Sequence, residues 1–125
     1  MSHDVIADGL NNIMNAKRAG KESVVLTRYS KVLIKVLEIA KENNYIKDFK
    51  EGKNDLEIIF GEGLNLIKSI KPRNNVTVKR IEFYMRRYLP AKDMGVIVIS
   101  TNKGLMTHKD AFEKNLGGSL IAYMY

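Results

Sequence analysis

The segment Ser100-Thr101-Asn102-Lys103-Gly104 carries the side chains with the clearest potential for chemistry. It leaves the strongest predicted strand of the chain, which lies within residues 95–100. Hydroxyl and amide groups of this size can reach base edges and ribose 2′-hydroxyls in the wide, shallow minor groove of A-form RNA. The lysine can neutralise a phosphate, and the glycine lets the backbone turn sharply and approach closely. The same residues also fit an ordinary polar loop, and their spacing alone does not separate the two interpretations.

Thr107 stands three residues beyond this segment, where the pattern predicts the start of a short helix. Free backbone N–H groups at a helix start favour an anion. Thr107 therefore joins the candidate contacts, although a plain helix cap explains its position as well.

Signatures of catalysis and of metal binding are absent from the sequence. The chain has no cysteine, which excludes disulfides, thiolate nucleophiles and cysteine-based zinc sites. His3 and His108 are its only histidines, and neither belongs to a recognisable ligand motif. The Gly61-Glu62-Gly63 turn leads to Lys68-Ser69 but lacks the second glycine and the helix of a phosphate-binding loop. We therefore expect no enzyme activity, no cofactor, no metal and no small-molecule substrate.

The charge of the chain is concentrated in its second half. The 125 residues carry a net charge of +7, and the sequence pI is about 9.6. Residues 1–70 hold 11 basic and 10 acidic side chains, whereas residues 71–125 hold 10 basic and 4 acidic ones. A basic surface gains affinity for a polyanion through counterion release. Solubility alone also explains a modest excess, but the asymmetry favours a binding face.

The periodicity of apolar residues predicts helices and short strands in two halves, residues 1–70 and the basic residues 71–125, with the boundary at the polar segment 71–75. The first half is expected to hold a helix over 4–19, a strand over 23–26, a helix from Ser30 to about Asn43, and strands over 45–50, 56–60 and 64–70. The last of these strands is expected to pair back on the one before it. Asp4 and Ser30 are the predicted helix caps, and Gly20 the first helix stop.

The second half is expected to hold an ambiguous segment over 76–88, a strand within 95–100, a short helix from Thr107 to about Asn115 and a last strand over 120–125. Gly117-Gly118 is the predicted break after the short helix. No apolar run is long enough to span a bilayer and no signal-peptide pattern opens the chain, so we expect a cytoplasmic protein with no membrane partner.

Several segments, in the right order, resemble one protein family. In the second half these are Ser100-Thr101-Asn102-Lys103-Gly104, Met106-Thr107-His108, Gly117-Gly118 and the terminal Ala122-Tyr123-Met124-Tyr125. In the first half they are Ile6-Ala7-Asp8, Asn15-Ala16, Ser30-Lys31, Val36-Leu37 and Tyr45-Ile46, while Ile70-Lys71-Pro72-Arg73 and Arg87 to Asp93 resemble the archaeal and eukaryotic branch. Over essentially its whole length the chain is similar to the eighth ribosomal protein of the small subunit.

This resemblance implies an α+β fold of two small halves, residues 1–70 and an RNA-binding half over residues 71–125, with helices packed on short, mostly antiparallel sheets. It also implies a structural constituent of the small ribosomal subunit that supports subunit assembly and translation and catalyses no reaction. It implies direct binding to a stem in the central domain of small-subunit ribosomal RNA, with neighbouring small-subunit proteins as further partners. Carried over by position, the RNA-binding residues are Asn15, Ser30, Lys31, Arg73, Ser100, Thr101, Asn102, Lys103, Gly104 and Thr107. Gly118 is expected to serve backbone approach rather than direct contact.

The sequence departs from the family's pattern at three places. Asn102 replaces a serine, Val5 stands where proline is usual, and Arg28-Tyr29 replaces a proline-containing step before Ser30. Three other functions stay open. The charge pattern also fits a generic basic RNA binder outside the ribosome and a module whose basic half docks an acidic partner, and the resemblance also allows a translational repressor of the chain's own message.

Overall fold

The computed structural model describes residues 5–71, 75–91 and 94–125. The chain divides into two compact units, Met1–Lys68 and Ser69–Tyr125. The first holds α1 (Val5–Arg18), β1 (Ser23–Leu26), α2 (Lys31–Glu42), β2 (Ile46–Glu51) and β3 (Leu56–Phe60). β4 (Ile67–Ser69) crosses the boundary, and the second unit continues with β5 (Asn75–Val76), α3 (Val78–Tyr88), β6 (Val96–Thr101), β7 (Gly104–Thr107), α4 (His108–Lys114) and β8 (Gly118–Met124). The predicted α+β class is confirmed.

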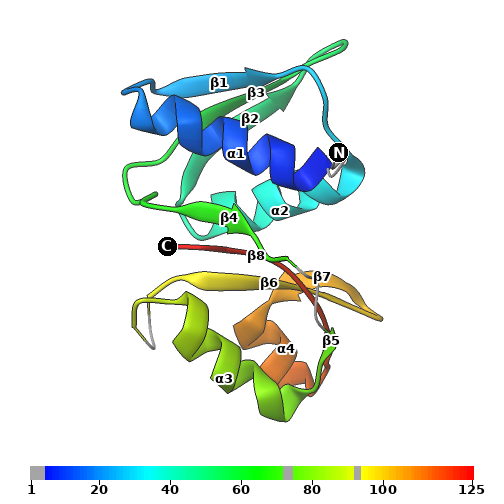
Figure 1. The fold of residues 1–125 in the computed structure, drawn as a ribbon. Helices are drawn as coiled ribbons and strands as arrows, with labels where there is room; N and C mark the ends of the chain where they lie inside the picture. The colour runs from blue at the N-terminus through cyan, green and yellow to red at the C-terminus, as the bar shows by residue number, and fades with distance from the viewer. Residues whose placement is uncertain (1–4, 72–74, 92–93) are drawn as a thin grey trace. The chain divides into compact units, whose positions relative to one another are not determined.

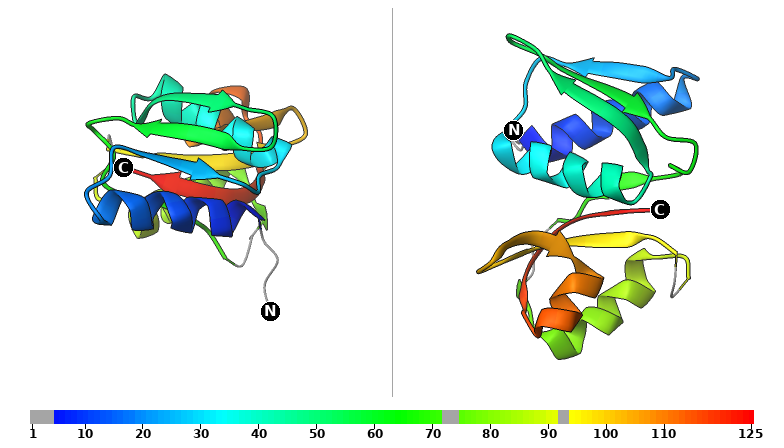
Figure 2. Two further views of the ribbon diagram at one scale, coloured as in Figure 1. Left: turned by 90° about the horizontal axis from the view of Figure 1, so that it is seen from above. Right: turned by 180° about the vertical axis from the view of Figure 1, so that it is seen from behind.

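In the first unit, α1 and α2 lie side by side on one face of an antiparallel sheet with strand order β1-β3-β2 (Figures 1 and 2). Apolar side chains from both helices and the sheet are fully buried between these layers: Leu10, Ile13, Leu33, Leu37, Ile46, Leu56 and Ile58. The helices approach closely at Gly9, where an added Cβ would lie 2.8 Å from Leu33 Cδ2. The amphipathic spacing predicted for both helices therefore forms the core of this unit.

Two of the predicted helix boundaries in the first unit are confirmed. The Ser30 hydroxyl accepts a hydrogen bond from the Leu33 N–H at 3.2 Å and caps α2. After α1, Gly20 adopts a φ of +81°, which is the left-handed conformation that ends a helix. The predicted cap Asp4 lies outside the described residues.

The strand predicted over residues 64–70 is wrong in extent and in partner. Only Ile67–Ser69 is extended, and it lies beside β8 rather than β3. Both edges of β3 are already occupied by β1 and β2, so β3 has no free edge for a further strand. The Ile67 N–H donates instead to Met14 Sδ at 3.3 Å. The apolar residues of this segment are thus buried without forming the predicted hairpin.

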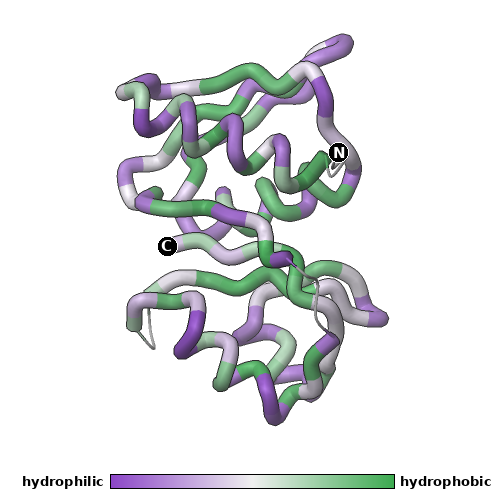
Figure 3. The backbone as a smooth tube through the Cα atoms, viewed as in Figure 1, coloured by the Kyte–Doolittle hydropathy of each residue, from purple (hydrophilic) through white to green (hydrophobic). Residues whose placement is uncertain are grey.

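The second unit is a sheet with order β4-β8-β6-β7, to which β5 adds beside β8. Helices α3 and α4 cover one face of this sheet (Figure 1). Their shared core contains Ile70, Val76, Ile81, Leu89, Ile97, Ile99, Met106, Ala111 and Leu120. Figure 3 shows β6 as apolar along most of its length, which agrees with its prediction as the strongest strand.

The ambiguous segment 76–88 is mostly helical. Ile81 is fully buried in the core, and Tyr84, Met85 and Tyr88 pack against it, so one face of α3 points inward at helical spacing. Within the described residues, no helix is long and apolar enough to cross a membrane.

The helix α4 begins as predicted, because the Thr107 hydroxyl accepts from the Asp110 N–H at 3.2 Å. It ends at Asn115 as predicted, and the left-handed φ of +56° at this residue closes the helix before the glycine pair is reached. Gly118 belongs to β8. The strand β7 was not predicted, since its four residues were interpreted as a loop and a helix cap.

Candidate nucleic-acid interface

The five residues 100–104 form the tip of the hairpin between β6 and β7, here called the hairpin tip. Thr101 pairs with Gly104, so Asn102 and Lys103 make the two-residue turn, and both are exposed. Gly104 has a φ of +107°, a conformation that L side chains rarely adopt, and open space lies around its Cα. Lys103 forms no ion pair with any described residue. The turn therefore presents one amide and one unpaired cation.

Ser100 and Thr101 point to opposite faces of the sheet, because successive strand residues alternate. The Thr101 hydroxyl donates to the Gly104 carbonyl at 2.8 Å and accepts from the Lys103 N–H at 3.1 Å. Its hydrogen-bonding capacity is thus used to close the turn. Within the part of the chain that the structure describes, the Ser100 hydroxyl has no hydrogen-bond partner. Both Ser100 and Thr101 are predicted to contact RNA. In the structure, the Thr101 hydroxyl stabilises the turn, whereas the Ser100 hydroxyl bonds no described residue.

A row of polar residues continues from Ser100 across the sheet. Ser100 is paired with Ser119 of β8, and Ser119 with Asn75 of β5. The Ser119 hydroxyl also bonds the Asn75 side-chain oxygen. Sequence analysis did not identify Ser119 or Asn75 as members of this row. The position of Ser119 directly after the glycine pair indicates its pairing with Ser100 only when β8 is known to lie beside β6.

Gly118 lies against the backbone of Ser100. An added Cβ would collide with the Ser100 carbonyl, which is main chain and cannot swing away. The expectation that Gly118 serves backbone approach is therefore confirmed. Its missing side chain lets β8 lie close to the first residue of the hairpin tip.

Thr107 and His108 lie at the base of the hairpin, where Thr107 is paired with Val98. His108 is fully buried, and its Nδ1 accepts a hydrogen bond from the Ile97 N–H at 3.1 Å. This bond places the imidazole proton on Nε2, which has no partner in the described structure. Burial, helped by the positive charge of Lys109, lowers the pKa of His108 from 6.5 to about 4. The ring is thus a neutral part of the core and not an exposed RNA contact.

The predicted contacts of the first unit fall on two helices. Ser30 and the exposed Lys31 begin α2, and the Tyr29 hydroxyl before them donates to Glu51 Oε1 at 3.2 Å. Asn15 is exposed near the C-terminal end of α1, six residues beyond Gly9, which contacts the first turn of α2. A six-residue separation is about 9 Å of helix, so Asn15 is set apart from Ser30 and Lys31. Arg73 lies outside the described residues.

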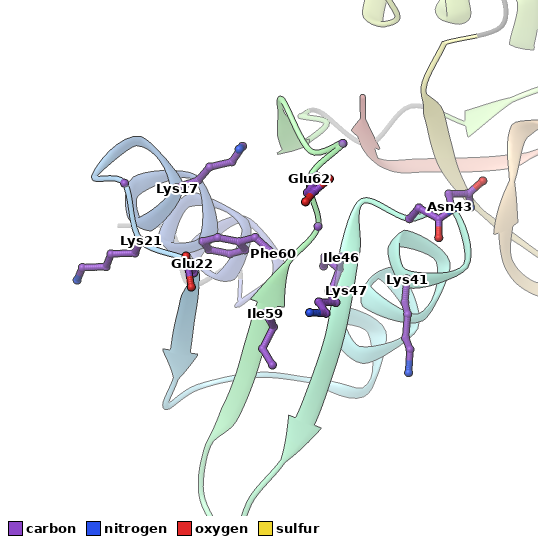
Figure 4. Close-up of a pocket in the computed structure, with 14 residues that line it drawn as sticks. Lys17, Lys21, Glu22, Lys41, Asn43, Ile46, Lys47, Ile59, Phe60 and Glu62 are labelled. Atoms are coloured by element: carbon purple, nitrogen blue, oxygen red, sulfur yellow. The ribbon is translucent and has the colours of Figure 1, made fainter.

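A groove at the other end of the first unit also contains lysines. It is lined where α1 and α2 end, β2 begins and β3 ends, and it includes Lys17, Lys21, Lys41 and Lys47 with Glu22 and Glu62. Lys41 is paired with Asp48 at 3.0 Å. Figure 4 shows the side chains of Lys17, Lys21 and Lys41 pointing in three different directions. Lys17 and Lys41 lie in the last turns of α1 and α2, where cations complement the helix dipole.

No group of three or more His, Asp or Glu side chains that could hold a metal occurs among the described residues.

Comparison with known proteins identifies the family. The sequence profile described as ribosomal protein S8 matches residues 4–125. The chain is 39% identical to the small ribosomal subunit protein uS8 of Nanoarchaeum equitans over 130 aligned positions, which cover all of both chains. It is 38% identical to uS8 of Picrophilus torridus, again over all of both chains. It is 37% identical to uS8A of Schizosaccharomyces pombe, over 97% of this chain and 96% of that protein.

These relatives are archaeal and eukaryotic, which agrees with the branch that the sequence resembles. They carry the names of ribosomal proteins and not of enzymes, and the prediction that this chain is not an enzyme is thereby confirmed. The match extends over both units and includes the hairpin tip. The chain therefore belongs to the ribosomal protein S8 family.

Proposed function

We propose that this small-subunit ribosomal protein binds a stem in the central domain of small-subunit ribosomal RNA and supports assembly of the subunit in the cytoplasm. The hairpin tip inserts its free polar groups into the minor groove at an irregular point of the stem. Neighbouring ribosomal proteins are the expected further partners. Family membership supports the ribosomal setting, and the chemistry of the tip supports the contact with RNA.

One observation carries this proposal: within the described residues, a hydroxyl without a hydrogen-bond partner near the end of β6 is followed by a turn that presents an exposed amide and a lysine without an ion pair. Ser100, Asn102 and Lys103 supply these three groups. Thr101 and Gly104 fix the turn, the first through two hydrogen bonds and the second through its positive φ. A preformed contact surface loses less conformational entropy on binding than a mobile loop. The tip is thus suited to test the shape of a groove.

The remaining predicted contacts contribute charge or position. Lys31, at the start of α2, and Arg73 are proposed to hold phosphates, and Asn15 and Ser30 to add contacts from the first half. The Thr107 hydroxyl accepts the cap bond of α4, which fixes its position, and its O–H is proposed to add a contact at the base of the hairpin.

The test compares binding to the cognate stem with binding to a plain RNA duplex. Ser100→Ala is expected to lose about 1–2 kcal/mol of discrimination, as for a hydrogen bond left unmade. Thr101→Ala is expected to lose a similar amount by loosening the turn, whereas Thr101→Ser keeps the hydroxyl and serves as its control. If both alanine variants discriminate the two RNAs as well as the wild type, the assignment of the tip is wrong.

The lysine contribution is measured by the salt dependence of binding. Lys103→Gln is expected to weaken binding to both RNAs and to reduce the slope of log affinity against log salt by about one. Lys21→Gln removes the same charge from the groove of the first unit and is expected to leave the slope unchanged. Equal slopes for Lys103→Gln and the wild type would remove Lys103 from the interface. Equal affinity of the wild type for every duplex would favour the generic RNA binder instead.

A further inference from the structure

The outer face of α3 carries an exposed phenylalanine among four cations. The phenylalanine is Phe83, which is 51% exposed. Figure 3 shows the helix as hydrophilic near both ends, where its charged residues lie. Those cations are Lys79, Arg80, Arg86 and Arg87. Ile81 and Tyr88 face the core, and at 100° per residue Lys79 and Phe83 lie on the side opposite to them.

The charges on this face are largely uncompensated. Glu82 is the only acidic residue of α3, and it pairs with Arg86 at 3.2 Å. Lys79, Arg80 and Arg87 form no ion pair with any residue that the structure describes. The helix therefore presents three surplus positive charges, and Arg80 and Arg87 are separated by about 10 Å along its axis.

The aromatic ring is already arranged with one of these cations. The Arg80 guanidinium carbon lies 4.8 Å from the centroid of the Phe83 ring, which is the geometry of a cation–π contact. The guanidinium lies over the ring, and Phe83 also forms an edge-to-face pair with Tyr84 at 5.2 Å between ring centroids. An exposed ring and a guanidinium plane are surfaces on which an unpaired base can stack.

We propose that the outer face of α3 binds a second segment of small-subunit ribosomal RNA, one with an unpaired base that stacks on Phe83 and Arg80. Lys79, Arg80 and Arg87 hold the flanking phosphates. This inference rests on the proposed function, but it concerns a different surface. The hairpin tip is formed by strands, and in both side views α3 lies in the helix layer beneath the sheet, ending at the opposite side of the unit from the tip (Figures 1 and 2).

An acidic protein segment is the competing occupant of this face. RNA fits this face better than an acidic protein segment, because the surplus positive charges surround an exposed aromatic ring on which a base can stack, and Phe83 itself does not line the neighbouring hollow. This hollow is lined by apolar residues in and directly after α3 and by Phe112 of α4, together with Glu82 and Arg86, but not by Lys79, Arg80 or Arg87.

The absence of cysteine allows a direct test, because a single introduced cysteine can carry a tethered iron chelate that cleaves nearby RNA. Glu82→Cys places the probe beside Phe83 without removing a proposed contact, Asn102→Cys places it on the hairpin tip, and Lys21→Cys serves as a surface control. The proteins are assembled into small subunits with full-length small-subunit ribosomal RNA. The inference predicts cleavage from position 82 at nucleotides distinct from those cut from position 102.

Cleavage from position 102 but none from position 82 would overturn the inference and leave the proposed function intact. No cleavage from position 102 would overturn the proposed function itself. Cutting from position 82 of the same nucleotides as from position 102 would also contradict a second segment.

Stacking is tested by substitution of Phe83 in the same assembled particles. Phe83→Ala is expected to reduce the yield of cleavage from position 82 roughly tenfold, as judged from the usual loss when a base loses its aromatic partner. Phe83→Tyr keeps a ring and is expected to retain cleavage, whereas Phe83→Leu keeps apolar area without a flat ring. If Phe83→Leu behaves like Phe83→Tyr, the RNA near α3 does not depend on a flat ring, and the proposed stacking on Phe83 is wrong. Circular dichroism of each variant establishes that α3 is folded.

Discussion

Acidification is expected to destabilise the second unit through one buried side chain, His108. The ring accepts a hydrogen bond from the Ile97 N–H through Nδ1 and is neutral in the folded protein. A proton on Nδ1 would break this bond and place a charge in the core beside Lys109. Burial and that neighbouring charge therefore lower the pKa of His108 from 6.5 to about 4.

Because the pKa of His108 is lower in the folded protein than in the unfolded chain, acidification lowers the free energy of unfolding. As the pH falls below 6.5, the unfolded chain takes up a proton at this histidine before the folded chain does. Stability is thus lost between about pH 6.5 and about pH 4, and the loss reaches a plateau below the folded pKa. This difference between the unfolded and folded pKa corresponds to a loss in the free energy of unfolding of about 3 kcal/mol at the plateau and of roughly 2 kcal/mol at pH 5. Small domains have only about 5–15 kcal/mol of stability in total.

Urea unfolding followed by circular dichroism at pH 7.5 and pH 5 measures this loss. The matched variant is His108→Asn, whose side-chain oxygen can still accept from the Ile97 N–H but does not titrate. It is expected to be less stable than the wild type at pH 7.5 and to lose roughly 2 kcal/mol less on acidification. His3→Asn removes the other histidine and is expected to keep the wild-type pH dependence. Equal losses for the wild type and His108→Asn would refute the reasoning.

Two further predictions concern positions that fix local geometry. Ser30→Ala is expected to destabilise the first unit by about 1 kcal/mol, because the Leu33 N–H loses its cap. Ser30→Asp keeps an acceptor and is expected to keep most of the stability. Thermal unfolding of both variants checks this, and an alanine variant as stable as the wild type would contradict it. Gly118→Ala is expected to destabilise the second unit by about 1–3 kcal/mol and to weaken RNA binding, because its Cβ collides with the Ser100 carbonyl. Gly104→Ala meets no atom and strains only its own backbone, so a larger loss of stability for Gly104→Ala than for Gly118→Ala would show that this clash is not the dominant effect.

Local signals predicted much of the fold because they act over a few residues. The hydroxyls of Ser30 and Thr107 identified two helix starts, and the β-branched run before Ser100 identified the central strand β6. The end of α4 near Asn115 was also predicted, although Asn115 itself, rather than the glycine pair, adopts the left-handed conformation that ends the helix.

The strand predictions were wrong where pairing depends on segments that are distant in the sequence. The segment 64–70 has apolar residues suited to a strand, but its pairing is decided by which sheet has a free edge. The short strand β7 exists because β6 lies next to it, and its own four residues carry little signal. Such choices are made by tertiary contacts that no local pattern contains.

The candidate site shows the same division. Composition and spacing indicated which segment carries the polar groups, but not which of them remain free. Thr101 is adjacent to Ser100 and equally polar, yet alternation along the strand turns it to the other face, where it bonds Gly104. Ser119 and Asn75 join the polar row only through strand register.

Chemical footprinting of small-subunit ribosomal RNA, with and without the protein, tests the central claim most directly. We expect protection of one stem of the central domain, weakened in parallel by Ser100→Ala and Lys103→Gln and unaffected by Lys21→Gln, in addition to any protection of the separate segment proposed to contact α3. Protection spread over many unrelated duplexes, or protection of one stem that is indifferent to the two substitutions in the hairpin tip, would contradict it.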